Sequence, residues 1–206
     1  MPDAEDHYFT ARPASTDERR ALRVELGGRE VEVEVAPGIF SPGGVDKGTR
    51  VLLAHVPAPP AHGDLLDLGC GWGPIALTLA LRSPDAGVWA VDVNERSLDL
   101  TRRNAAALGL ANVHASTPDG IPGREFDLIW SNPPVRIGKA ALHELLLTWL
   151  PRLRPGGSAF LVVQRNLGSD SLQRWLADTL GETHEVGRYA TGSGFRVLRV
   201  NRRMTA

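Results

Sequence analysis

The sequence predicts an α/β fold, a Rossmann-like sheet of seven strands with helices on both faces. First, from residue 64 onward short apolar segments alternate with helical patterns, which is typical of a doubly wound, mostly parallel sheet. Second, a glycine-rich turn joins the first of these strands to the first of these helices. Third, only "TGSG" (191–194) separates the last two strands, which predicts a hairpin that places one antiparallel strand in the sheet.

The elements of this sheet follow in chain order. Strands are expected at 64–69, 87–93, 112–116, 126–132, 158–164, 184–190 and 195–201. Helices are expected between them at about 73–82, 95–109, 138–150 and 170–180. Five parallel strands and the final hairpin make the seven strands, and right-handed crossovers distribute the helices over both faces.

Residues 1–63 have a different pattern, which predicts a small hairpin and helix segment. Apolar and polar residues alternate over 21–35 around Gly27 and Gly28, as in a hairpin. Residues 45–56 predict a helix that leads into the proline-rich stretch 57–63. Because this segment is too small to fold alone, we expect it to belong to the same domain as residues 64–206.

Composition excludes several classes of protein. A length of 206 residues with 42% apolar residues suits one globular domain, and a net charge of -1 argues against a general polyanion binder. There is no 18-residue apolar run, and the first residues are acidic and polar, so we expect neither a membrane anchor nor a secretory signal. The single cysteine and six scattered histidines predict a cytoplasmic protein without disulfides and without a metal site.

The glycine-rich turn predicts a ligand site. Gly69, Gly71 and Gly73 separate a strand from a helix, where they let the backbone approach a ligand near the unpaired N–H groups of the helix start. Asp67, at the strand end, can pair with an amine or hydroxyl of that ligand. The spacing D-x-G-x-G-x-G differs from the dinucleotide pattern and fits a ligand with an amino acid group better than a pyrophosphate. The alternative is a tight turn without a ligand, with Cys70 as a small buried filler.

The second and third strands end in further candidate residues. Asp92 follows the second strand, at the position where a carboxylate accepts hydrogen bonds from a ribose diol. Its alternative role is to cap the helix that follows, but Asn94 is the better candidate for the cap. Ser116 and Thr117 follow the third strand, where they either contact an adenine edge or lie in a solvated loop.

The fourth strand ends at Asn132, Pro133 and Pro134. Two prolines stop a strand from pairing further, and the asparagine has donors and acceptors to offer at that end. The simplest alternative is a turn that only terminates the strand.

These motifs together resemble a known class of enzymes. "DLGCGWG" (67–73), "VDVNERSLDL" (91–100) and "FDLIWSNPP" (126–134), in this order, resemble the class I S-adenosylmethionine-dependent methyltransferases, and the Asn-Pro-Pro ending resembles their amino-methylating branch. "HYFTARPAS" (7–15) and "VAPGIFSPGGVDKGTRVLL" (35–53) resemble, more narrowly, the RsmC-like small-methyltransferase family. Its members methylate the exocyclic amine of a guanine in small-subunit ribosomal RNA.

The resemblance implies an S-adenosylmethionine-dependent N-methyltransferase that acts on guanine N2 in 16S ribosomal RNA, with the RNA or the small ribosomal subunit as partner. Asn132, Pro133 and Pro134 are the implied catalytic residues, because the side-chain carbonyl of Asn132 and the backbone carbonyl of Pro133 can accept the protons of the amine. The implied cofactor residues are Asp67, Gly69, Cys70, Gly71, Gly73, Asp92, Val93, Ser116, Thr117 and Asn132. The implied substrate residues are Phe40, Val135, Arg136 and Lys139.

The chain departs from the family pattern in two respects. The best-known members carry a degenerate second domain before the catalytic one, and they commonly have an aromatic residue where this chain has Val135; Phe40 or Trp130 would then stack on the base. Phosphate contacts are expected from Arg136 and Lys139, and from the arginines near both ends, which are Arg12, Arg19, Arg20, Arg196, Arg199, Arg202 and Arg203.

Three alternative functions remain open from the sequence. The same chemistry could act on a protein glutamine or a small molecule, or the chain could be a non-catalytic module that binds S-adenosylmethionine or RNA. The third alternative is an NAD-dependent oxidoreductase, but this chain lacks the glycine spacing that such an enzyme requires. The sequence leaves the oligomeric state open.

Overall fold

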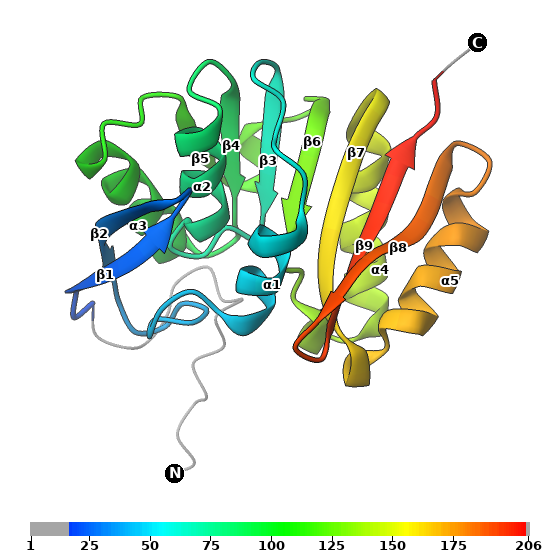
Figure 1. The fold of residues 1–206 in the computed structure, drawn as a ribbon, viewed down its shortest axis with the longest axis horizontal. Coiled ribbons are helices and arrows are strands. Elements are labelled where there is room, and N and C mark those ends of the chain that lie inside the picture. Colours follow the sequence, from blue (N-terminus) through cyan, green and yellow to red (C-terminus); the bar gives the residue numbers. More distant parts are fainter. Residues whose placement is uncertain (1–16, 205–206) are drawn as a thin grey trace.

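The computed structural model describes residues 17–204 and contains the expected seven-stranded α/β sheet. The strand order is β5-β4-β3-β6-β7-β9-β8 (Figure 1). Pairing is parallel from β5 through β7, and β9 is antiparallel to both of its neighbours, as the short connection predicted. The strands are β3 (Asp64–Leu68), β4 (Gly87–Val91), β5 (Val113–Ser116), β6 (Phe126–Ser131), β7 (Leu153–Gln164), β8 (His184–Gly192) and β9 (Phe195–Arg202).

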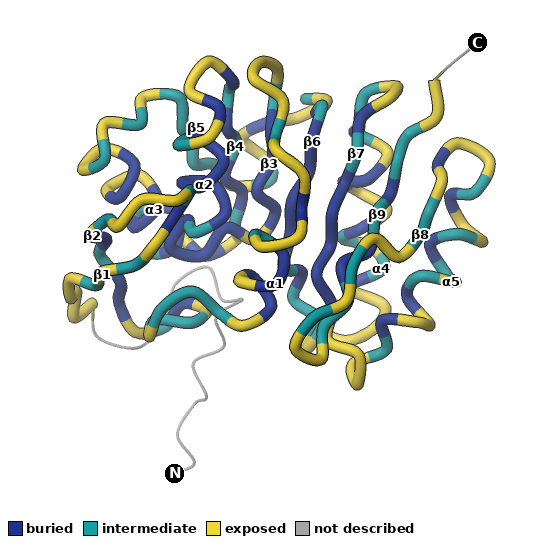
Figure 2. The backbone as a smooth tube through the Cα atoms, in the orientation of Figure 1, coloured by how far each residue is buried: buried dark blue, intermediate teal, exposed yellow. Residues whose placement is uncertain are grey.

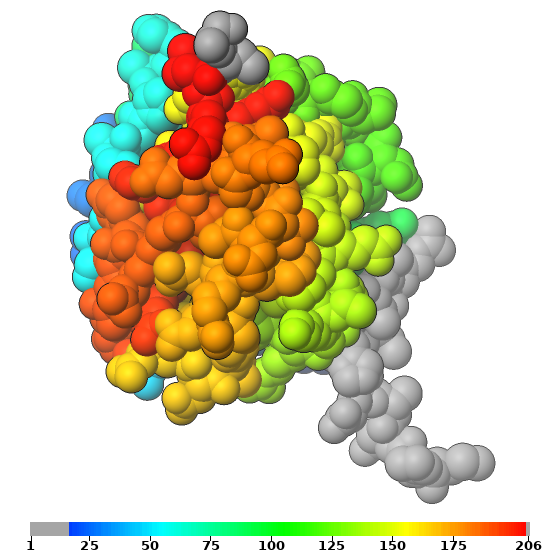
Figure 3. All heavy atoms as spheres, turned by 90° about the vertical axis from the view of Figure 1, so that its right-hand side faces the viewer, coloured from blue at the N-terminus to red at the C-terminus, as the bar shows by residue number. Residues whose placement is uncertain are grey.

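Five α-helices of residues 17–204 cover the two faces of the sheet. They are α1 (Lys47–His55), α2 (Pro74–Arg82), α3 (Glu95–Ala107), α4 (Lys139–Trp149) and α5 (Ser169–Leu180). Successive strand residues point to opposite faces, so Leu65 packs in a cluster with residues of α1 and α2, whereas Leu66 packs in a cluster with residues of α4 and α5. Figure 1 shows α1 in front of the sheet and α4 behind it, and in Figure 3 α5 and α4 form the surface on the side of β8.

Two buried faces explain why the central strands have nearly continuous apolar sequences. Figure 2 shows dark blue, the colour of buried residues, along β3, β4, β6 and β7. The expected strand and helix bounds agree with the structure within two residues, except for the start of β7. The strand β7 begins at Leu153 rather than at 158, because Pro155, Gly156 and Gly157 form an irregular extension that sequence patterns assign to a turn.

The N-terminal segment forms the expected hairpin and helix. Strands β1 (Arg20–Leu26) and β2 (Arg29–Val35) pair as a separate two-stranded sheet, and Gly27 and Gly28 adopt positive φ in the turn. The inner face of this hairpin packs against α2 and α3 in one apolar cluster. Asn104 of α3 joins the two parts, because its side-chain amide donates to the carbonyl of Glu34 and its Oδ1 accepts from the N–H of that residue.

One edge of the sheet collects residues from distant parts of the chain. The parallel strands β3, β4, β6 and β7 end there, so Gly69, Asp92 and Asn132 follow at the same edge. The antiparallel strand β9 starts at this edge with Phe195. Ligands of open α/β sheets bind outside the carboxyl ends of the strands. No helix in residues 17–204 has the length and apolar composition to span a membrane.

Candidate active site

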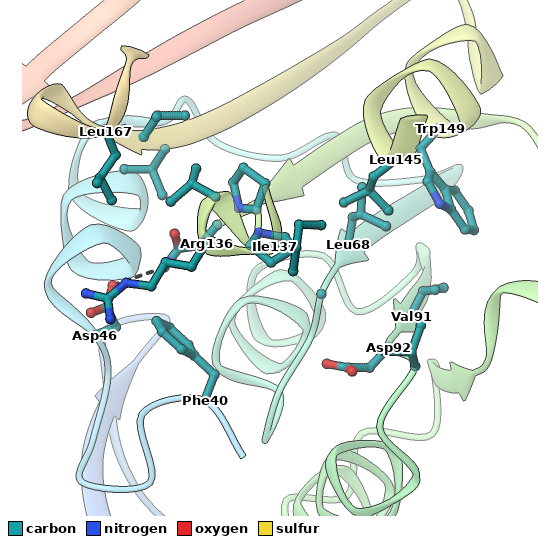
Figure 4. Close-up of a pocket in the computed structure, with 18 of the residues that line it drawn as sticks. Phe40, Asp46, Leu68, Val91, Asp92, Arg136, Ile137, Leu145, Trp149 and Leu167 are labelled. Carbon is teal, nitrogen blue, oxygen red and sulfur yellow. Dashed lines mark hydrogen bonds between the residues drawn. The ribbon is translucent and has the colours of Figure 1, made fainter. Parts of the chain in front are cut away.

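A cavity of about 390 Å³ lies at the carboxyl edge of the sheet. The loops after β3, β4, β6 and β7 line it, together with the loop that precedes α1 and the first residue of β9. Figure 4 shows Asp46, Phe40 and Arg136 toward one end of this cavity, and Asp92 and Val91 toward the other. Apolar side chains form most of the wall, including Leu68, Ile137 and Leu145.

The glycine loop between β3 and α2 has a backbone that requires glycine. Gly69, Gly71 and Gly73 have φ of 81°, 56° and 97°, in the region where other residues are strained. The N–H groups of Gly69 and Cys70 both donate to the carbonyl of Val91, at the end of β4. The loop is therefore fixed against the neighbouring strand at the position where Asp92 follows.

Asp92 lines the cavity and is held by backbone N–H groups. Its Oδ2 accepts from the N–H of Gly71 and its Oδ1 from the N–H of Asn94, both at 2.9 Å. Each carboxylate oxygen has a further lone pair with which to accept a hydroxyl of a ligand. Burial raises the pKa of Asp92, and these hydrogen bonds oppose the rise.

Asn94 caps α3, as the sequence predicted, and this leaves Asp92 available to a ligand. The side chain of Asn94 accepts from the N–H groups of Arg96 and Ser97 in the first turn. Its amide also donates to the carbonyl of Gly38, which ties the loop before α1 to the start of α3. Val93 lies between the two polar residues, 44% exposed, and lines the cavity with an apolar surface.

Asp67 is placed behind the glycine loop, not in the cavity. Its side chain is fully buried, and Oδ2 accepts from the N–H of Ala76 at 2.9 Å in the first turn of α2. Oδ1 accepts no hydrogen bond from residues 17–204. Burial raises the pKa of Asp67 to about 8, against the effect of the Ala76 N–H and with a contribution from Asp92. Asp67 therefore organises the loop from within the protein.

The Asn-Pro-Pro segment forms a sharp turn at the end of β6. The N–H of Val135 donates to the carbonyl of Pro133 at 2.8 Å, and Pro134 has φ of -74° and ψ of 73°. These values describe an inverse γ-turn, to which proline is suited because its ring fixes φ. One lone pair of the Pro133 carbonyl is thus used within the turn, and the other remains available.

The amide of Asn132 is held from the opposite side. Its Nδ2 donates to Oδ2 of Asp46 at 3.0 Å and to Oγ1 of Thr49 at 3.1 Å. Both residues belong to the start of α1, where Asp46 is the N-cap. Both protons of the side-chain amide of Asn132 are therefore donated to the start of α1. The side-chain oxygen of this amide, Oδ1, accepts no hydrogen bond from the described residues.

The structure brings together only part of the predicted site. The cavity is lined by Phe40, Gly69, Asp92, Val93, Asn132, Pro133, Pro134, Val135 and Arg136. A small adjoining pocket is lined by Cys70 and Gly71, with Phe40 and Asn132 shared between the two. The predicted residues that line neither are Asp67, Gly73, Ser116, Thr117 and Lys139.

Several residues that the sequence analysis considered for the site have a local structural reason for their position. Ser116 donates its hydroxyl to the carbonyl of Thr117, and the next residue, Pro118, is the one that lines the cavity. Lys139 is exposed at the first position of α4. Cys70 is 2% exposed and burial raises its pKa well above the usual value, so it is a buried thiol. Trp130 is fully buried beneath α1 and α2, which excludes it from stacking on a base.

Three of the arginines considered for RNA contact form ion pairs within the described part of the protein. Arg19 pairs with Asp17 and Asp99, and Arg196 pairs with Asp170. Arg202 pairs with Glu125. Arg12 lies outside the described residues.

Among the cavity residues without a role in the sequence analysis are Asp46, Gln164 and Phe195. Asp46 comes from the N-cap of α1, Gln164 ends β7, and Phe195 begins β9. The sequence signals were present but indirect. "VDKGT" has the pattern of a helix start, and an antiparallel strand begins at the edge where its parallel neighbours end.

Comparison with known proteins agrees with this architecture. The sequence matches the family described as "Methyltransferase small domain" over residues 30–199. It is 30% identical over 185 residues to the protein YbxB of Bacillus subtilis (strain 168), covering 88% of this chain and 92% of that protein. It is 35% identical over 204 residues to the ribosomal RNA small subunit methyltransferase C of Pseudomonas entomophila (strain L48), covering 96% of this chain and 58% of that protein.

A solved structure shows the same similarity. The 16S rRNA N2 G1207 methyltransferase (RsmC) of T. thermophilus, in complex with AdoMet and guanosine, has a TM-score of 0.74 and 26% identity. The match covers 93% of this chain and 52% of that one. The chain thus spans nearly all of YbxB and about half the length of the RsmC relatives.

Proposed function

Because the chain belongs to the methyltransferase small domain family, we propose that it transfers a methyl group from S-adenosylmethionine to the exocyclic N2 amine of a guanine in small-subunit ribosomal RNA. The observation that carries the proposal is that one cavity is lined both by Asp92, a ribose acceptor, and by Asn132 and Pro133, two amine acceptors. The relatives that act on ribosomal RNA support this choice of substrate.

The residues around Asp92 fit S-adenosylmethionine. The carboxylate of Asp92 has unused lone pairs for two ribose hydroxyls, and Val93 offers an apolar surface to the adenine. Gly69 allows a close backbone approach at the end of the cavity nearest the loop. The cavity volume lies within the usual range of about 300–1,000 Å³ for ligand sites. S-adenosylmethionine supplies an electrophilic methyl group on a sulfonium.

Asn132 and Pro133 would activate the amine by accepting its two protons. The lone pair of an exocyclic amine is delocalised into the base, so the amine is a poor nucleophile. Hydrogen bonds to Oδ1 of Asn132 and to the remaining lone pair of the Pro133 carbonyl turn that lone pair toward the methyl carbon. The same two acceptors stabilise the positive charge that develops on nitrogen during transfer. After transfer the nitrogen loses a proton readily, so no strong base is required.

Two aromatic rings could hold the target base in the cavity. Val135 occupies the position where family members commonly have an aromatic residue, but Phe40 and Phe195 line the same cavity from other elements. Phe40 is 38% exposed, which leaves part of its ring open to a ligand. Removing a base from its stack in the RNA costs a few kcal/mol, and stacking of that base on an aromatic ring of the protein offsets this cost.

Arg136 is the basic residue best placed to contact the RNA backbone. It is exposed, lines the cavity and lies two residues after Pro134. Lys139 is exposed one turn further on and would contact phosphate outside the cavity. Such contacts position the RNA without reading its sequence.

The proposal can be tested by mass spectrometry of ribosomal RNA nucleosides from cells with and without the gene. We expect the deletion to remove one N2-methylguanosine from the small-subunit RNA, and the purified protein to restore it in vitro with S-adenosylmethionine. An unchanged set of methylguanosines, or methyl transfer to glutamine peptides and not to RNA, would contradict the proposal. Asn132→Ala protein serves as the control, since it should bind the cofactor without restoring the nucleoside.

A further inference from the structure

The start of α1 contacts the side chain of Asn132, although 86 residues separate Asp46 from Asn132. A single carboxylate oxygen, Oδ2 of Asp46, accepts from the N–H groups of Gly48 and Thr49 and from Nδ2 of Asn132. The second proton of Nδ2 is donated to Oγ1 of Thr49. The helix cap and the end of β6 therefore share one hydrogen-bond network.

We propose that Asp46 and Thr49 are positioning residues that hold the Asn132 amide in one orientation, with its carbonyl oxygen free to accept a proton of the target amine. This inference rests on the proposed function, since it specifies how that function obtains its acceptor. An amide rotated by half a turn would place Oδ1 against the Asp46 carboxylate, where two acceptors repel each other. The negative charge of Asp46 thus selects one of the two amide orientations.

Gly48 supplies an independent observation for this arrangement. A Cβ on Gly48 would lie 2.9 Å from Oδ2 of Asp46 and 3.0 Å from the ring of Phe195. Because φ at Gly48 is not positive, glycine is required here for space rather than for backbone conformation. Three residues of the motif Asp46-Lys47-Gly48-Thr49 therefore have a role. Asp46 caps the helix and accepts from Asn132, Gly48 leaves space for the Asp46 carboxylate, and Thr49 is the second acceptor for Asn132.

Burial makes the arrangement effective. Thr49 is 3% exposed, so water does not compete for its hydroxyl, and Asp46 and Asn132 are half-buried at the cavity wall. Hydrogen bonds to a charged acceptor in a partly dry site are stronger than neutral ones in water. The amide is thus oriented before any substrate arrives, which removes a reorganisation step from the reaction.

The side-chain amide of Asn132 can be observed directly by NMR. In protein labelled with ¹⁵N, its pair of N–H signals is assigned by its absence in Asn132→Ala. We expect Thr49→Val, which keeps the shape and removes the acceptor, to raise the hydrogen exchange rate of these protons about fivefold or more. Thr49→Ser, which keeps the acceptor, should restore slow exchange. Equal exchange rates in all three proteins would overturn the proposal, whether or not the protein methylates RNA.

Kinetics then test whether the orientation serves catalysis. Thr49→Val and Asp46→Asn should each lower kcat about tenfold, with KM for RNA and Kd for S-adenosylmethionine nearly unchanged. In an Asn132→Ala background neither substitution should lower kcat further, because both act through the same amide. Additive losses in the double variants, or a loss confined to S-adenosylmethionine affinity, would overturn the positioning role. A wild-type protein inactive on RNA would instead contradict the proposed function, while the exchange measurement still decides the inference.

Discussion

The backbone N–H of Gly71 donates to Oδ2 of Asp92 at 2.9 Å. The contact joins the glycine loop after β3 to the acid after β4, 21 residues further along the chain. It fixes the Asp92 carboxylate and shapes the loop at the same time, so a change in either one is expected to alter the other. The two strongest ligand motifs of the sequence are in this sense one structural unit.

Asp92→Asn should weaken the binding of S-adenosylmethionine. An amide group in place of one oxygen would face the N–H of Gly71 or of Asn94, and it would accept fewer hydrogen bonds from ribose. We expect Kd to rise about 10-fold to 100-fold, measured by isothermal titration calorimetry. Asp85→Asn, in the exposed turn before β4, makes the same charge change and should leave Kd as it is. Equal Kd values for the two variants would exclude the ribose role.

Asn132→Ala should abolish most catalysis and preserve cofactor binding. The variant removes one of the two acceptors for the target amine and leaves Asp92 and the glycine loop intact. A fall in kcat of about 100-fold to 1,000-fold is expected, as for the loss of one contact to a charge that develops in the transition state. The fall is measured with saturating S-adenosylmethionine, and Kd for it should stay within about twofold. Near-normal kcat would contradict the assignment of Asn132.

Asp67→Asn should change how stability depends on pH. The pKa of Asp67 in the folded protein is about 8, above the ordinary value of 3.8, so folding favours the protonated carboxyl. Its contribution to stability is present below about pH 4 and is lost as the pH rises through about 8. Asparagine does not titrate, so the variant should gain free energy of unfolding relative to the wild type between these limits.

Denaturant unfolding at several pH values measures this effect. The difference between variant and wild type should rise with a slope of at most about 1.4 kcal/mol per pH unit, the value for one proton. It should become constant above about pH 8, where the wild-type carboxyl is ionised. A difference that does not vary between pH 4 and pH 8 would show that Asp67 is ionised throughout.

Arg136→Gln should lower the affinity for RNA and make this affinity less dependent on salt concentration. One phosphate contact fewer reduces the slope of log K against log salt concentration by about 0.7 to 1. Binding is measured by fluorescence anisotropy over a series of salt concentrations. Arg82→Gln is the matched control, because Arg82 is also exposed but lies in the last turn of α2, away from the cavity. An identical slope for both variants and the wild type would remove Arg136 from the RNA contact.

Much of the fold was predictable because its signals are local. Strands buried on both faces have continuous apolar sequences, and the turns between elements contain the glycines and prolines that their backbones require. The exception, the start of β7, has the composition of a turn, and the sheet neighbours decide its pairing. The position of Asp92 at the cavity was also predictable, because Asn94 is the better helix cap and the structure confirms that cap.

Other parts of the site depend on contacts between distant segments. Asp67 was expected at the ligand, but the close packing of β3 against α2 buries its carboxylate behind the loop. Trp130 and Phe195 are both aromatic and both belong to apolar strands, and only the face and direction of each strand distinguish the core residue Trp130 from the cavity residue Phe195.

The sequence by itself determined the seven-stranded α/β sheet, the glycine loop, the acid after the second parallel strand and the Asn-Pro-Pro turn, because each is encoded within a few neighbouring residues. The tertiary structure alone decided which of these residues face one cavity, and it added Asp46 and Phe195 to that cavity and Thr49 to the adjoining pocket. The physical reason is that hydrogen-bond partners and cavity walls depend on the spatial order of the strands, which brings together residues far apart in the chain.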